Sequence, residues 1–121
     1  MQYLDFTEMP VWQKGLEIVE KIYELTGRLP RSEDFALSSQ LKRASLSVPA
    51  NIAEGFGRDH TNDKIRFYIY SRSSAFEIRS HLLAGQRVNF FTETEIRQIN
   101  QLCLQIVEAN NKIIKGLRNS I

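Results

Sequence analysis

Cysteine is nearly absent from this sequence, because Cys103 is the only one among 121 residues. No disulfide can therefore form within the chain, and such a composition is typical of a reducing compartment. The sequence also lacks any run approaching the roughly 18 consecutive apolar residues of a membrane span. Residues 1–5 lack the basic and apolar regions of a signal peptide. We therefore expect a protein that spans no membrane and stays in the cytoplasm.

The sequence offers equally little to a catalytic or metal site. Its two histidines, His60 and His81, are too far apart to share a helix face as ligands, and Cys103 has no companion. The glycines of residues 55–58 resemble a phosphate loop only superficially, because no strand precedes them and no Lys-Ser/Thr pair follows. No serine is spaced so as to pair with a base and an orienting acid. We expect no enzymatic activity, no cofactor and no metal.

The composition is typical of one globular domain that covers residues 1–121. Apolar residues make up 42% of the chain and charged residues 25%, as in folded proteins. The net charge is only +2, but it is unevenly distributed. Residues 1–41 hold four Lys/Arg and seven Asp/Glu, whereas residues 42–87 hold eight and four. Positive charge is thus concentrated in the middle of the chain.

Three breaks, at residues 27–32, 57–62 and 88–92, divide the chain into four segments. In the first and last segments, apolar residues recur at three- and four-residue steps and polar residues take the opposite side, which predicts amphipathic helices. Pro10 suits the first turn of the first helix, and Thr92 with Glu95 forms a capping box before the last. The sequence therefore predicts an all-α fold, a bundle of four helices.

Pro49 lies inside the second helical segment. The apolar positions continue at helical spacing on both sides of it. Proline in a helix interior costs about 3 kcal/mol and kinks or breaks the helix. We expect one continuous helix that is kinked at Pro49, and a split into two helices is the alternative.

The third segment, residues 61–87, has two apolar faces rather than one. A helix that is apolar all round is buried all round. In a bundle of only four helices, a second copy of the chain is the simplest cover for the second face, so we expect a homo-oligomer. The predicted interface consists of Phe67, Tyr70, Ser74, Ile78 and His81.

Arg72 and Arg79 fall on the first apolar stripe of the same segment, where a guanidinium is costly unless a carboxylate meets it. Glu54 is a candidate partner. One interpretation is a structural ion pair that fixes the helix register. The other is an arginine pair that faces a groove and binds phosphate.

Basic residues also gather in the second segment and around the turn into the third. Such residues suit contacts with nucleic-acid phosphates, which depend on salt and largely ignore sequence. A solvated surface is the alternative interpretation. The candidate nucleic-acid-binding residues are Lys42, Arg43, Arg58, Lys64 and Arg66, with His60 beside them.

Several short runs become recognisable together, and the most specific is Ser-Val-Pro-Ala-Asn-Ile-Ala-Glu-Gly at residues 47–55. With residues 11–14, residues 39–44 and Arg58, it resembles the four-helix-bundle family known as 23S rRNA intervening sequence proteins. The resemblance extends over residues 6–117. It implies an up-and-down bundle that assembles into a barrel-like homopentamer, and it supplies no agreed catalytic residues.

A similar bundle serves as the accessory protein of diversity-generating retroelements, where a basic pentamer binds nucleic acid and a reverse transcriptase. The resemblance therefore implies RNA, DNA or such a polymerase as a partner. Our leading hypothesis is a non-enzymatic, pentameric scaffold that binds nucleic acid through its basic residues. The alternative is an oligomeric protein-interaction module without affinity for nucleic acid.

Overall fold

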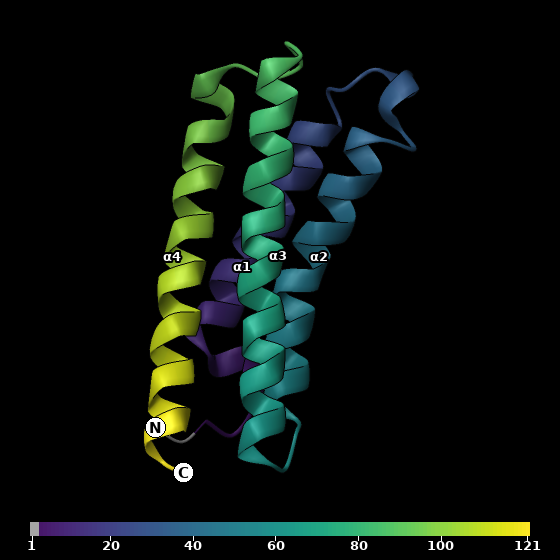
Figure 1. Cartoon of the computed structure of the whole chain (residues 1–121). Helices are drawn as coiled ribbons and strands as arrows, with labels where there is room; N and C mark the ends of the chain where they lie inside the picture. The colour runs from purple at the N-terminus through teal and green to yellow at the C-terminus, as the bar shows by residue number, and fades with distance from the viewer. Residues whose placement is uncertain (1–2) are drawn as a thin grey trace.

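Four long helices lie alongside one another in the computed structural model, which describes residues 3–121 (Figure 1). The chain reverses direction at each connection, as in an up-and-down bundle (Figure 1). No strand occurs among these residues, so the predicted all-α four-helix fold is confirmed. The helices are α1 (Pro10–Thr26), α2 (Leu37–Phe56), α3 (Thr61–Arg87) and α4 (Glu93–Asn119), with short 3-10 turns η1 (Phe6–Glu8) and η2 (Arg31–Glu33).

The helix ends follow the local signals in the sequence. Pro10 occupies the first turn of α1. At the start of α4, the Thr92 N–H donates to Glu95 Oε1 over 2.8 Å and the Glu95 N–H donates to Thr92 Oγ1 over 3.2 Å. The backbone N–H of Thr92, and then its hydroxyl, lower the pKa of the Glu95 carboxyl because they stabilise its charged form. The predicted capping box is therefore present and pairs two of the free N–H groups of α4.

All four helices contribute aliphatic side chains to one core. Each helix turns one stripe inward, and the removal of these side chains from water is the main stabilisation of the bundle. Fully enclosed examples are Ile18 and Ile22 from α1, Leu41 and Ile52 from α2, Ile78 and Leu82 from α3, and Ile106 and Ile114 from α4.

α2 runs without interruption through Pro49, which confirms the expected continuity. The kink at Pro49 stays a prediction. Pro49 has no N–H, so the carbonyl of Ser45 loses the hydrogen bond it would accept in a regular helix. The buried ring lies against α1, where a Cβ added to Gly15 would be 3.3 Å from Pro49 Cβ. Gly15 thus permits close contact between the two helices.

A buried chain of polar side chains joins three helices beside Pro49. The Ser71 hydroxyl of α3 donates to the carbonyl of Val48 in α2 over 2.9 Å. Asn110 of α4 in turn donates through Nδ2 to Ser71 Oγ over 3.2 Å. Ser71 and Asn110 are both fully buried. Because a buried polar group is costly when unpaired, this arrangement fixes the register of the three helices.

Replacement of Ser71 by Ala should lower the free energy of unfolding by about 1–3 kcal/mol, since it leaves the Asn110 amide without its buried acceptor and the Val48 carbonyl without this donor. Urea denaturation measures the change. Ser73→Ala is the matched control, because Ser73 is exposed on the same helix and should change stability by less than about 0.5 kcal/mol. Equal stability of the two variants would contradict the role given to Ser71.

Candidate nucleic-acid interface

Two arginines flank one aromatic ring near the turn between α2 and α3. The guanidinium carbon of Arg58 lies 4.4 Å from the centroid of the Phe67 ring, and that of Arg66 lies 5.0 Å from it. Both arginines are exposed, whereas Phe67 is only 8% exposed. Cation–π attraction holds a guanidinium against such a ring, so the arginine pair, Arg58 and Arg66, is oriented before any ligand arrives.

The two members of the arginine pair differ in their other contacts. Arg66 Nη2 lies 3.3 Å from Asp63 Oδ1, and both side chains are largely exposed. Within residues 3–121, Arg58 has no carboxylate oxygen within 4.0 Å. Exposed ion pairs contribute little and are easily exchanged for another anion. Arg58 can therefore bind a phosphate directly. Arg66 can do so once its weak ion pair with Asp63 is broken.

Lys64 has a structural task at the same turn. Its Nζ donates to the carbonyl of Gly55 over 3.2 Å and to that of Phe56 over 2.9 Å. These carbonyls end α2, where the helix dipole favours a positive charge. An ammonium has three donors, so one remains for another acceptor.

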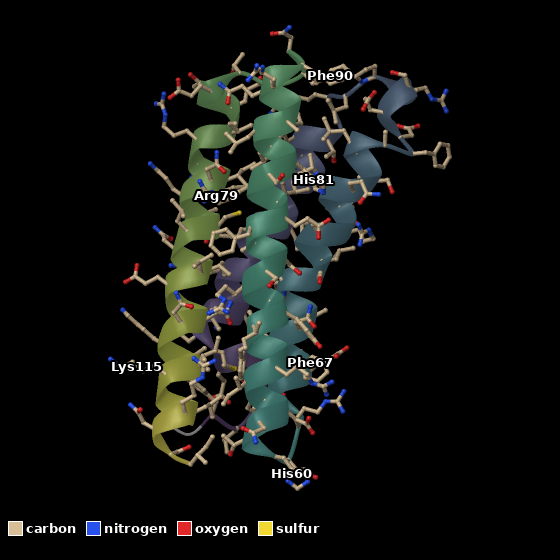
Figure 2. The ribbon with its side chains drawn as sticks, in the orientation of Figure 1. His60, Phe67, Arg79, His81, Phe90 and Lys115 are labelled. Carbon is tan, nitrogen blue, oxygen red and sulfur yellow. The ribbon has the colours of Figure 1, made fainter. Side chains whose placement is uncertain are left out.

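The structure divides the predicted basic cluster into two groups. Lys42 and Arg43 lie fourteen or so residues before Phe56, the last residue of α2, which is roughly 20 Å along the helix axis. Lys42 Nζ lies over the Tyr23 ring at 5.3 Å, and Arg43 Nη2 lies 3.3 Å from Glu77 Oε2. Only Arg58, Lys64 and Arg66 come together at the turn, with His60 exposed at that end of the bundle (Figure 2).

The predicted oligomer interface is also divided. Phe67 and Ser74 are 8% exposed and Ile78 is fully buried, so the chain's own helices already cover these three residues. Tyr70 remains 45% exposed, and His81 lies half-buried with Nε2 3.1 Å from Glu77 Oε2. The apolar character of this face of α3 therefore reflects contact with α2 to a large extent.

Two large exposed apolar side chains of α3 lie on the first apolar stripe, the one that also carries Arg72 and Arg79. Phe76 is 46% exposed and Leu83 is 47% exposed, and Leu104 of α4 is 46% exposed. Helical spacing puts Phe76 and Leu83 on the same stripe as the buried Ala75 and Leu82, and spacing alone does not separate covered from exposed positions. The sequence did contain one signal of this exposure. The apolar stripe is wider than two neighbouring helices can cover.

The expected partnership of Glu54 with Arg72 or Arg79 is wrong. Arg72 Nη1 donates to Asn111 Oδ1 of α4 over 2.8 Å, and the buried Nε of Arg79 has no partner among the described residues. Glu54 is exposed on α2, whereas Arg79 lies on the side of α3 that faces α4 (Figure 2). The two arginines thus belong to the α3/α4 contact.

Most of the run at residues 47–55 serves packing. Val48, Pro49, Ile52 and Gly55 are buried. A Cβ on Gly55 would lie 3.1 Å from Cζ of Tyr68, so this glycine allows α2 and α3 to approach. The run therefore helps to position the adjacent turn, and with it Arg58.

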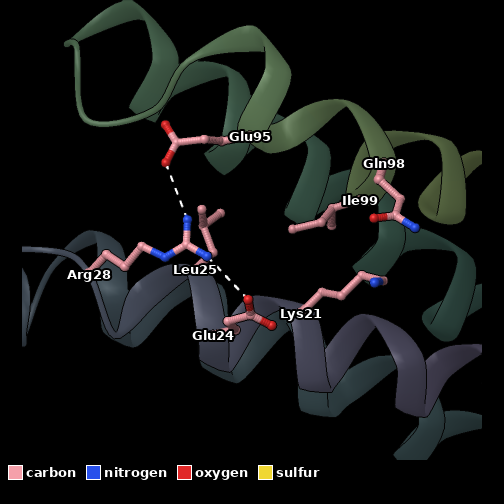
Figure 3. A pocket seen from close by; sticks show the side chains of 7 residues that line it. All are labelled: Lys21, Glu24, Leu25, Arg28, Glu95, Gln98 and Ile99. Carbon is pink, nitrogen blue, oxygen red and sulfur yellow. Dashed lines mark hydrogen bonds and ion pairs between the residues drawn. The ribbon is translucent and has the colours of Figure 1, made fainter.

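A notch of about 220 Å³ between α1 and α4 shows no catalytic arrangement (Figure 3). Arg28 bridges it, with Nη2 3.1 Å from Glu24 Oε1 and Nη1 3.6 Å from Glu95 Oε2. Both carboxylates lie on the surface and are already paired. The notch is smaller than the roughly 300 Å³ at which small-molecule sites usually begin.

Residues 3–121 contain no group of three or more His, Cys, Asp or Glu side chains that could hold a metal. Cys103 is fully buried, and burial raises the pKa of its thiol to about 12. The thiolate is the reactive form of cysteine, so Cys103 acts here as a core residue. None of the described helices combines the length and apolar character required to cross a membrane.

The fold and the turn define an all-α four-helix bundle with a small arginine-rich surface. Residues 7–112 match the family model of the 23S rRNA-intervening sequence protein, so the chain belongs to this family. This confirms the resemblance found in the sequence.

The chain is also similar to a solved structure from Bacteroides thetaiotaomicron, which is described as a protein of unknown function from the S23 ribosomal protein family. The two share 26% identity and superpose with a TM-score of 0.80, over 87% of this chain and 98% of the other. No curated protein matches the sequence. These similarities define the fold and the family and assign no activity.

Proposed function

We propose that this protein is a non-enzymatic homo-oligomeric scaffold of the cytoplasm that binds RNA or DNA through the arginine pair. The observation that carries the proposal is the stacking of Arg58 and Arg66 on Phe67, at 4.4 and 5.0 Å. Guanidinium groups bind phosphate through two parallel hydrogen bonds, and a ring that fixes their orientation reduces the entropy lost on binding.

The chemistry of the turn favours contacts with the phosphate backbone over contacts with bases. Arg58, Lys64 and Arg66 supply positive charge within a short segment. Phosphate contacts carry no sequence information. The scaffold therefore binds nucleic acid with strong salt dependence and little sequence preference.

The exposed apolar residues of α3 and α4 support assembly with further copies. Phe76, Leu83 and Leu104 are each nearly half exposed, and association with another copy would remove such apolar surface from water. The pentameric stoichiometry rests on the family resemblance. Repetition of the arginine pair around a ring raises the local potential and strengthens phosphate binding.

A protein-interaction module without affinity for nucleic acid is the second candidate. Asp63 already neutralises Arg66 and Glu77 neutralises Arg43, which weakens the positive field of the surface. Exposed Leu46 of α2 and Tyr70 of α3 offer apolar contacts instead. The partner in this case is a protein such as a reverse transcriptase.

The first test compares two double variants with equal loss of charge. Arg58→Gln/Arg66→Gln removes the arginine pair, whereas Arg31→Gln/Arg97→Gln removes two exposed arginines that lie at η2 and at the start of α4. Fluorescence anisotropy with a structured RNA and with duplex DNA is measured across a salt series. The first variant should lose at least about tenfold in affinity, and its salt slope on DNA should fall by about two.

The Arg31→Gln/Arg97→Gln control should bind nearly as the parent does. An equal loss in both variants would indicate a nonspecific charge effect and contradict a site at the turn. Absence of binding by the parent chain at low salt would favour the protein-interaction module.

The second test concerns assembly. Phe76→Ser/Leu83→Ser should shift the mass measured by light scattering toward that of a single chain, because both replacements remove exposed apolar contacts from α3. Phe35→Ser is the control, since Phe35 is 97% exposed in the loop before α2 and should leave the oligomer intact. A parent protein that is monomeric at micromolar concentration would contradict the oligomer proposal.

A further inference from the structure

A second cavity lies at the end of the bundle where α2 ends, α3 begins and α4 ends. Its volume is about 560 Å³, within the range of roughly 300–1,000 Å³ that is usual for small-molecule sites. Met9, Phe56, Tyr68, Ile113 and Leu117 give it a largely apolar lining. Of the basic residues at the turn, only Lys64 lines this cavity, and the arginine pair lies outside its lining.

The charged groups of the lining have one sign. Lys64 and Lys112 are present and no acidic residue is among the ten residues that line the cavity. Lys64 keeps one N–H beyond the two that bond to α2. Lys112 Nζ lies 3.4 Å from Glu108 Oε1, but both side chains are more than 70% exposed, so this ion pair is weak.

Tyr68 adds a neutral donor. It is 4% exposed, and burial raises its pKa to about 12. Its side chain lines the cavity. A phenol O–H can donate a hydrogen bond to an acceptor.

Gly116 supplies an independent argument. A glycine inside a helix is unfavourable relative to alanine, and packing explains Gly15 and Gly55. At Gly116 of α4, an added Cβ would meet no atom within 4 Å. Packing therefore does not require glycine here. Because Gly116 lines the cavity, the missing side chain leaves the cavity open.

We propose that this cavity binds a small amphipathic carboxylate of the size of a medium-chain fatty acid. The apolar body lies against Phe56, Ile113 and Leu117, and the carboxylate accepts hydrogen bonds from the lysines. A nucleotide fits less well, because the lining contains no amide or carboxylate side chain that could pair with the edge of a base.

The test uses isothermal titration calorimetry with sodium decanoate below its micellar concentration. Three probes separate the contributions: decyltrimethylammonium has the same chain and the opposite charge, acetate has the charge alone, and adenosine monophosphate represents nucleotides. Decanoate should bind once per chain, and each of the other three should bind at least tenfold more weakly. Equal binding of the cation, or no binding of decanoate, overturns the proposal.

Substitutions in the cavity lining then test whether decanoate binds in this cavity. Gly116→Phe should reduce decanoate affinity at least tenfold by filling the opening, whereas Gly116→Ala should retain it. Gln105→Phe is the control, because it adds the same ring at an exposed position of α4 outside the cavity. Lys112→Met should weaken binding several-fold without touching the core, and it keeps the test open if Gly116→Phe fails to fold. Parent-like binding by both Gly116→Phe and Lys112→Met overturns the proposal.

Discussion

The hydrogen bond from Ser71 of α3 to the carbonyl of Val48 in α2 is the centre of the buried polar contact that joins three of the four helices. It lies beside Pro49, where α2 lacks one of its own backbone bonds, and Asn110 extends it to α4. A buried polar group tolerates few alternative registers, since any slip leaves donors and acceptors unpaired. The register of α2 against α3 in turn decides which residues flank the connecting turn. The arginine pair on Phe67 therefore depends on a contact far inside the core.

Much of the fold could be predicted from the sequence because its signals are local. The helical periodicity of residues 10–26 and 93–119, the breaks between helices and the capping box of Thr92 and Glu95 all depend on neighbours within one or two turns. The bounds of α3 followed from the same signals. Local signals alone could not decide whether α2 continues through Pro49, because that depends on how the helix packs in the core.

The partners of α3 could not be predicted in the same way. Periodicity shows that two faces are apolar, but not that the chain's own helices cover Phe67, Ser74 and Ile78 while Phe76 stays exposed. Glu54 was a candidate partner for Arg72, yet Arg72 donates to Asn111, because the packing of α3 against α4 sets its neighbour. Of the candidate binding residues, the sequence found Arg58, Lys64 and Arg66, but it could not show that Lys42 and Arg43 lie elsewhere.

Hydrogen–deuterium exchange with and without a structured RNA tests most directly whether binding and packing are separate tasks of this chain. Protection on binding should be confined to the α2–α3 turn, residues 57–67, which includes the arginine pair. Residues 45–53 should exchange slowly in both states, because they belong to the buried contact around Pro49. RNA-dependent protection of residues 45–53, or none at the turn, would contradict this account.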